Sequence, residues 1–406
     1  MTPAFASDKE TPALNFSGRI PELDGLRGIA IGMVIVWHYF YLPAVVRPGT
    51  FLWYVLLPGR LSWAGVDLFF VLSGFLIGGI LLDARKASNY FRVFYTRRFF
   101  RILPIYAAVL LVFPLLNLLR HGGILRAGGS PPWYMYWTFT QNFWMAAASS
   151  LGANSLVMTW SLAVEEQFYL TLPLLVRKFA ENALTALVLL GIALAPILRI
   201  SLRFLWPNNW GAAYVLMPCR ADALLLGVLA AILLRDKKWR ARIVRSTSFF
   251  ALLFSLLLAG IVFLDSKSPG FDSSFMQKIG YTWLAVFFAC VLVFALTRPN
   301  SLVSRVLRVA WLGWVGTIAY GTYLFHQGVQ RLVFRLFSID PPAITSAYTL
   351  AISVAALGLT LAIARLSWHF FELPLMGFGH RSRYAFEDLP RALERGEFSS
   401  SEVVRP

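Results

Sequence analysis

The chain has 406 residues, of which 58% are hydrophobic and only 14% charged, and its mean hydropathy is +0.64. Soluble domains contain about 25% charged residues, so this composition excludes a soluble globular protein and also a disordered one. The formal net charge of +17 would favour nucleic-acid binding in a soluble protein. Here the basic residues form short runs between apolar segments, as in membrane proteins with several spans, so we expect no nucleic-acid partner.

Ten apolar segments are long enough to cross a bilayer, whose hydrocarbon core of about 30 Å needs about 20 residues per helix. The first 19 residues are polar and have no signal-peptide pattern, so the first apolar segment is expected to be a retained span. The predicted spans lie near residues 28–46, 63–83, 103–119, 156–176, 184–204, 214–234, 248–264, 277–296, 311–330 and 345–366.

The basic loops predict the orientation. With ten spans and a cytoplasmic N-terminus, the most basic loops, such as 84–101 and 235–245, fall on one face, which the positive-inside rule places in the cytoplasm. This arrangement requires that the aromatic segment 133–150 does not cross, so we expect it to be re-entrant or interfacial.

The predicted fold is therefore an all-α, polytopic membrane protein. Residues 20–376 are expected to form one transmembrane domain, between polar cytoplasmic tails at 1–19 and 377–406.

Polar residues inside apolar spans are costly in lipid, so they are candidates for function. In the first span, Arg27 and His38 are eleven positions apart, about 1100° or three turns plus roughly 20°, so an α-helix would place both on one face, about 16 Å apart. Histidine titrates near neutral pH, which favours His38 as a general base. An interhelical hydrogen bond is the alternative.

Two arginines stand at the start of the third span. Arg98 and Arg101 are three apart and share a helix face, so their guanidinium groups could form a fork for phosphate. The alternative is that they only set the topology and touch anionic lipid.

The second and fourth spans carry further polar residues. Asp67 and Ser73 lie in a glycine-rich segment, but no nucleophile-elbow motif surrounds Ser73. Glu165 and Glu166 are adjacent and point about 100° apart, so at most one is expected to face a given site.

In the ninth span, Tyr323 and His326 are three apart and share a face. No H-x-x-x-H pair or carboxylate cage accompanies the histidines, so no metal is expected.

These residues belong to seven blocks that occur in a defined order, and through them the chain resembles the acyltransferase 3 family of integral membrane acyltransferases. The resemblance covers residues 20–376. The blocks read DGLRGIAIGMVIVWHYF, VDLFFVLSGFLIGGIL, RRFFRILP, WSLAVEEQFYLTLPLL, CRADALLLGVLAA, AYGTYLFHQ and SWHFFELPL.

The resemblance implies transfer of an acyl group, usually acetyl, from cytoplasmic acyl-coenzyme A to a hydroxyl of a carbohydrate or glycolipid at the bacterial inner membrane. It implies that His38 activates the acceptor, with Arg27 in the same motif. Arg98 and Arg101 would contact coenzyme A phosphates, and Glu165 is the motif glutamate. Tyr323 and His326 match a late polar block whose role is open.

The acceptor is not decided by these motifs. Lipopolysaccharide and exopolysaccharide sugars, peptidoglycan, and a macrolide or other small glycoside all remain open. The alternative from another class is a transporter or flippase of a glycan or lipid-linked intermediate, because polar residues at mid-membrane also mark substrate paths.

Overall fold

The computed structural model describes residues 18–121, 129–152, 155–267 and 270–386, and within these residues the chain forms helices and no strand. The α-helices are α1 Pro21–Ile35, α2 Phe51–Leu56, α3 Gly65–Asp83, α4 Tyr90–His121, α5 Trp133–Trp137, α6 Gln141–Ala148, α7 Thr159–Lys178, α8 Glu181–Leu205, α9 Gly211–Val215, α10 Met217–Arg235, α11 Lys237–Arg245, α12 Thr247–Lys267, α13 Tyr281–Thr297, α14 Leu302–Leu307, α15 Ala310–Thr317, α16 Ala319–Leu336, α17 Ala347–Ser367 and α18 Leu373–His380.

Four further helical segments depart from α geometry. Leu57–Ala64 is a 3₁₀ helix that leads into α3. Val36–Tyr41, Met276–Gly280 and Trp368–Glu372 are π-helical, and each continues or precedes an α-helix without a break. Short π-helical turns inside α-helices are frequently found at functional sites.

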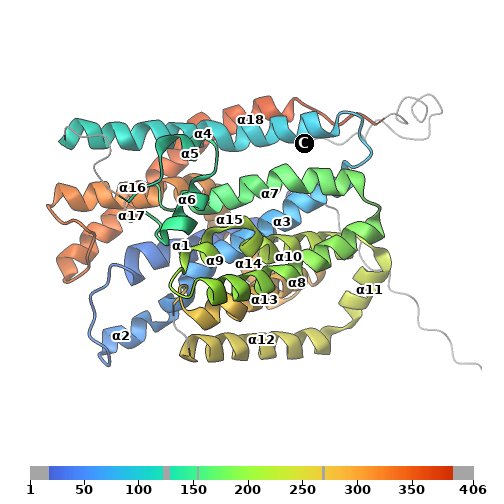
Figure 1. Cartoon of the computed structure of the whole chain (residues 1–406), viewed down its shortest axis with the longest axis horizontal. Helices are drawn as coiled ribbons and strands as arrows, with labels where there is room; N and C mark the ends of the chain where they lie inside the picture. Colours follow the sequence, from blue (N-terminus) through green and yellow to red (C-terminus); the bar gives the residue numbers. More distant parts are fainter. Residues whose placement is uncertain (1–17, 122–128, 153–154, 268–269, 387–406) are drawn as a thin grey trace, which may run out of the picture.

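The long helices lie side by side in a bundle (Figure 1). The connections from α3 to α4, from α7 to α8 and from α10 to α12 lie at the same end, where the described chain also finishes. These connections carry the basic runs, so the structure gathers that positive charge at one end of the bundle.

α3 and α10 form the centre, because their backbones touch. A Cβ atom on Gly74 would lie 1.8 Å from the carbonyl oxygen of Leu224, and one on Gly227 would lie 2.1 Å from that of Val71. Both distances are far below van der Waals contact, so only glycine permits this approach. Gly74 of the second predicted span therefore serves helix packing.

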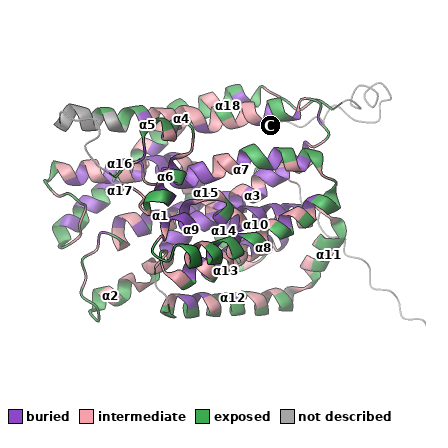
Figure 2. Cartoon of the chain, in the orientation of Figure 1, coloured by how far each residue is buried: buried purple, intermediate pink, exposed green. Residues whose placement is uncertain are grey.

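The outer helices expose apolar side chains. The apolar window of α3 is 72% buried, whereas those of α8 and α12 are only 22% buried, and Figure 2 shows exposed residues along both of these helices. An apolar surface of this extent suits contact with lipid rather than water.

Among the described residues, six helices are long and apolar enough to span a membrane, so the expected number of about ten is not confirmed. The six are Phe51–Asp83, Glu181–Leu205, Gly211–Arg235, Ser248–Lys267, Met276–Thr297 and Ala347–His380. The other four predicted spans fall on α1, on α4, on α7 and on the pair α15 and α16, which is broken at Ile318. Apart from Asp67 and Ser73 in α3, the polar residues singled out above lie on these four.

Helix length corrects one local expectation and agrees with another, that segment 133–150 does not cross the membrane. The basic loop predicted at 84–101 is helical from Tyr90 onward, because α4 is a single helix of 32 residues. The segment 133–150 forms the short helices α5 and α6, of five and eight residues. At 1.5 Å per residue neither can cross a bilayer core of about 30 Å.

The predicted tails lie mostly outside the described residues, which begin at 18 and end at 386. Residues 377–380 complete α18, and residues 382–385 pack against the start of α4.

Candidate active site

A cavity of about 210 Å³ lies between α1, α3, α4, α7, α16 and the π-helical segment Trp368–Glu372. Most of the predicted site residues line it, although they come from five different helices. They are Arg27, Ser73, Arg98, Arg101, Glu165 and Tyr323.

The cavity runs along the bundle. It follows α7 from Ser161 to Tyr169, eight residues or about 12 Å of helix. Because α7 and α4 are antiparallel, Ser161 and Tyr323 lie toward one end of the cavity, and Arg98 and Arg101 toward the other, near the basic connections.

Two of the three arginines that line the cavity form no ion pair with the described residues. Arg27 is paired, since its Nη1 donates to Asp24 at 2.9 Å. Within the part of the chain that is described, neither Arg98 nor Arg101 forms an ion pair. The Nε of Arg98 is buried without a hydrogen-bond partner, and Arg101 only approaches the sulfur of Met376 at 3.8 Å. These two guanidiniums are therefore available to an anionic ligand.

Three carboxylates share this cavity: Glu165, Glu166 and Glu372. The expectation that only one of the two adjacent glutamates faces a given site is wrong. The cavity extends around α7, so two adjacent residues that point about 100° apart both line it.

Ser73 lies in the cavity wall. Its hydroxyl hydrogen-bonds with that of Tyr169. A serine nucleophile needs an adjacent general base, usually histidine. Among the described residues, no histidine lines this cavity.

His38 and His326 form a pair beside the cavity. Their ring centroids are 4.8 Å apart, and His326 lies 5.6 Å from the ring of Tyr323, which does line the cavity. Tyr323 also hydrogen-bonds with Ser161 at 2.5 Å, so the cavity wall and the histidine pair are continuous.

Both histidines have the same tautomer. His38 Nδ1 is 2.9 Å from the carbonyl oxygen of Val34, and His326 Nδ1 is 2.6 Å from that of Tyr323. A carbonyl only accepts, so each Nδ1 carries the proton and each neutral ring keeps its lone pair on Nε2. Each Nε2 is therefore able to accept a proton.

The predicted common face of Arg27 and His38 stays a prediction. α1 ends at Ile35, and His38 lies in the π-helical segment Val36–Tyr41, where the angle of 100° per residue does not apply. Arg27 lines the cavity, whereas His38 does not line it and lies against His326.

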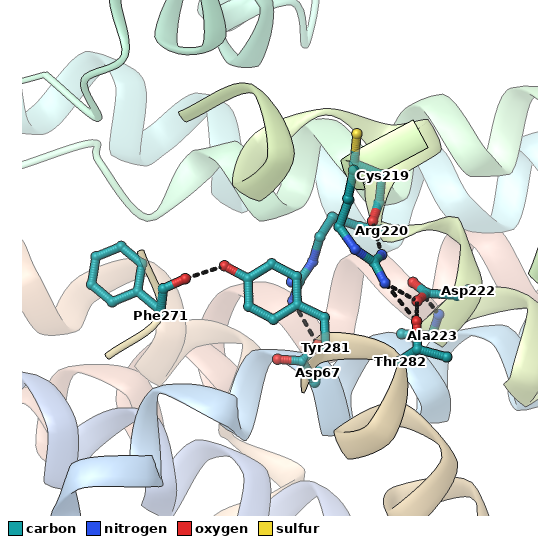
Figure 3. Close-up of polar contacts among 9 residues, drawn as sticks. Asp67, Cys219, Arg220, Asp222, Ala223, Phe271, Tyr281 and Thr282 are labelled. Atoms are coloured by element: carbon teal, nitrogen blue, oxygen red, sulfur yellow. Dashed lines mark hydrogen bonds and ion pairs between the residues drawn. The ribbon is translucent and has the colours of Figure 1, made fainter. Parts of the chain in front are cut away.

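Asp67 belongs to a different cluster. It is fully buried and pairs with Arg220 of α10 at 2.6 Å, while the guanidinium of Arg220 lies 4.0 Å from the centre of the Tyr281 ring. Figure 3 shows the pair of Asp67 and Arg220 near Asp222, which accepts a hydrogen bond from the hydroxyl of Thr282. Asp67 therefore holds α3 and α10 together and does not face the cavity.

The acyltransferase domain model matches residues 20–365, which is most of the chain. Of the elements that line the cavity, only the π-helical segment Trp368–Glu372 and α18 lie outside this match. The chain belongs to this acyltransferase family.

Three relatives share most of the length of this chain. A peptidoglycan O-acetyltransferase, OatA, of Listeria monocytogenes is 28% identical over 88% of the chain. A putative peptidoglycan O-acetyltransferase, YrhL, of Bacillus subtilis is 30% identical over 89%, and an O-acetyltransferase, OatA, of Staphylococcus aureus is 26% identical over 95%.

The chain spans a little over half the length of these relatives, 56% of the first two and 61% of the third. No solved structure matches it. With the apolar helices described above, membership of this family identifies an integral membrane protein.

Sequence reasoning missed several residues of this cavity. Ser161 precedes Glu165 by four residues, and Tyr169 follows it by four. A search for polar residues at a spacing of four within the same block would have found both. Glu372 and Trp368 lie in a π-helical segment far along the chain, and no periodicity connects them to the cavity.

Proposed function

We propose that the chain is a membrane O-acetyltransferase that moves an acetyl group from acetyl-coenzyme A to a hydroxyl of a carbohydrate. The observation that supports it most is the pair Arg98 and Arg101, which form no ion pair with the described residues and stand at the basic end of the cavity. Coenzyme A is a polyanion with a long, thin arm, and this arrangement fits both properties.

The donor would enter from the basic end. Its phosphates would meet the arginines, and the arm would follow the apolar wall formed by residues such as Leu72, Leu76 and Leu162. This orientation carries the thioester toward Tyr323, beyond which the histidine pair lies.

The acceptor hydroxyl would attack the thioester carbonyl while His38 Nε2 takes its proton. The new C–O bond forms as the C–S bond breaks, and the coenzyme leaves as a thiolate that recovers a proton. His38 suits this role because its Nδ1 is fixed by the carbonyl of Val34 and its ring is partly exposed. Glu165, which faces the cavity directly, is the second candidate.

For the acceptor we propose a peptidoglycan sugar, because relatives that share about nine-tenths of this chain carry that substrate in their names. Lipopolysaccharide, exopolysaccharide and small glycosides such as macrolides are the other outcomes of the test. A transporter of a glycan would need no site for an acyl donor, so the arginines that form no ion pair favour the acyltransferase over the transporter.

Removal of the gene should remove acetyl groups from the cell wall. Mass spectrometry of peptidoglycan fragments should show loss of the species heavier by one acetyl group, and the gene should restore it. Loss from another glycan instead would reassign the acceptor. If the glycans are unchanged and the purified protein does not bind acetyl-coenzyme A, the transporter becomes the favoured function.

We also propose the arrangement in the membrane. About ten spans within residues 20–376 would place the tails 1–19 and 377–406 and the basic connections in the cytoplasm of a bacterial inner membrane. The four less apolar spans would be tolerated because their polar side chains face the cavity or one another rather than lipid.

Cysteines introduced at Ser88 and Ser401 should therefore resist an impermeant thiol reagent in intact cells and react after permeabilisation. A cysteine at Thr50, in the exposed connection at the opposite end, should react in intact cells. Labelling is read against a parent in which the native Cys219 and Cys290 are replaced by serine. Labelling of Ser88→Cys from outside would reverse the orientation.

Arg98→Ala and Arg101→Ala should each weaken coenzyme A binding about tenfold or more, because a hydrogen bond to a charged group contributes about 1.5–3 kcal/mol. Lysine should restore little if the contact is a planar fork. Calorimetry on the purified protein measures this. Arg92→Ala, an exposed residue on the same helix, is the control and should bind as the parent does. Unchanged affinity in the double alanine variant would leave these arginines with a topological role only.

A further inference from the structure

A second cavity of about 90 Å³ lies next to the first, on the outer side of Arg98 and Arg101. These two arginines line both cavities. The second one is closed by the C-terminal segment, through His380 at the end of α18 and Tyr384 beyond it. A water needs only about 10–15 Å³ of such space, so this cavity is large enough for a bigger group.

The polar lining of this cavity consists almost entirely of donors. Three guanidiniums face it, from Arg97, Arg98 and Arg101, and no carboxylate among the described residues lines it. Two donors in it have no partner in the described protein: the hydroxyl of Tyr384 and Nε of Arg98, both buried. Burial also raises the pKa of Tyr384, so its phenol stays protonated and able to donate.

The C-terminal segment is held in place by specific hydrogen bonds. Arg97 donates to the carbonyl oxygen of Ser382 through Nε at 3.0 Å and Nη2 at 2.8 Å, and its guanidinium lies 5.2 Å from the centre of the Tyr384 ring. Asn89, just before α4, donates to the carbonyl oxygen of Arg383 at 2.9 Å and accepts from the N–H of Ala385 at 3.0 Å. The position of Tyr384 is therefore fixed by its neighbours on both sides.

Buried donors without acceptors are costly unless a ligand supplies the acceptors. A phosphate monoester supplies several oxygens and negative charge, which matches three guanidiniums and a phenol. We propose that this cavity is a phosphate subsite built by the C-terminal segment, and that it binds the 3′-phosphate of the coenzyme A donor. This assignment rests on the proposed function, because the shared arginines would then contact the same donor from both cavities.

The test compares coenzyme A with 3′-dephospho-coenzyme A, which lacks only this phosphate. Affinities are measured by calorimetry on the full chain in phosphatidylcholine nanodiscs. The parent should bind coenzyme A at least tenfold more tightly than the dephospho form. Tyr384→Phe keeps the ring beside Arg97 and all the backbone anchors but loses the hydroxyl. It should weaken coenzyme A about tenfold and leave the dephospho form unchanged.

Tyr348→Phe is the matched control, because Tyr348 is 61% exposed at the start of α17. It should bind both coenzymes as the parent does. Equal affinity of the parent for the two coenzymes would overturn the subsite while leaving the proposed function intact, whereas binding of neither would defeat the proposed function itself. Equal weakening of both in Tyr384→Phe would also overturn the subsite, since it would indicate a structural role.

A lipid headgroup is the other source of a phosphate monoester at this face. Measurements in nanodiscs that contain phosphatidic acid distinguish a lipid headgroup from the coenzyme A phosphate. If the parent does not discriminate between the coenzymes, and phosphatidic acid raises its unfolding temperature more than that of Tyr384→Phe, the cavity binds lipid and the assignment to the donor is overturned.

Discussion

His38→Gln should lower the rate of acetyl transfer by about 10²–10⁴-fold, the usual contribution of a general base. Glutamine retains the size and a hydrogen-bonding group, so it can still meet the carbonyl of Val34, but it cannot take a proton at neutral pH. Coenzyme A binding should be unchanged, because His38 does not line the cavity in which the donor is proposed to lie. The measurement is acetyl transfer by the purified protein, with donor affinity determined in parallel.

His369→Gln is the matched control. His369 is exposed and lies in the π-helical segment Trp368–Glu372 without lining the cavity, so this variant should transfer acetyl at the parent rate. If His38→Gln also works at close to the parent rate, then His38 is not the base, and Glu165 or His326 takes its place. Loss of donor affinity together with activity would instead indicate a histidine needed for packing.

Arg220→Met should destabilise the protein by about 3–5 kcal/mol, because it leaves the buried carboxylate of Asp67 without its partner. The same substitution removes the guanidinium from the face of Tyr281. Since α3 and α10 form the centre of the bundle, the effect should appear as a large drop in the unfolding temperature of the purified protein, measured in one fixed detergent.

Asp83→Asn is the control for this prediction, because Asp83 and Arg235 form the other ion pair between the same two helices at 2.7 Å. The side chain of Asp83 is 57% exposed, so its removal should cost at most about 1 kcal/mol. The double variant Asp67→Leu with Arg220→Met should be more stable than Arg220→Met alone, since no buried charge is left. An unfolding temperature of Arg220→Met equal to that of Asp83→Asn would contradict the central role of the buried pair.

The amino-acid sequence by itself determined the class of fold and the candidate residues for the chemistry. Hydrophobic runs of about 20 residues report directly on helices, because a helix rises 1.5 Å per residue and lipid forbids unpaired backbone groups. Arg98 and Arg101 were recognisable because they are charged at the edge of an apolar run. The cost of charge in lipid is a local property that a sequence reveals.

The tertiary structure alone decided which of these residues meet. Asp67 and Glu165 look alike in the sequence, as acids inside apolar helices, yet Asp67 is neutralised by Arg220 and Glu165 faces the cavity. The partner of each acid lies on another helix, and helical periodicity carries no information about contacts between helices. Similarly, the sequence argument treated the first span as one α-helix, whereas His38 lies in a π-helical turn to which 100° per residue does not apply.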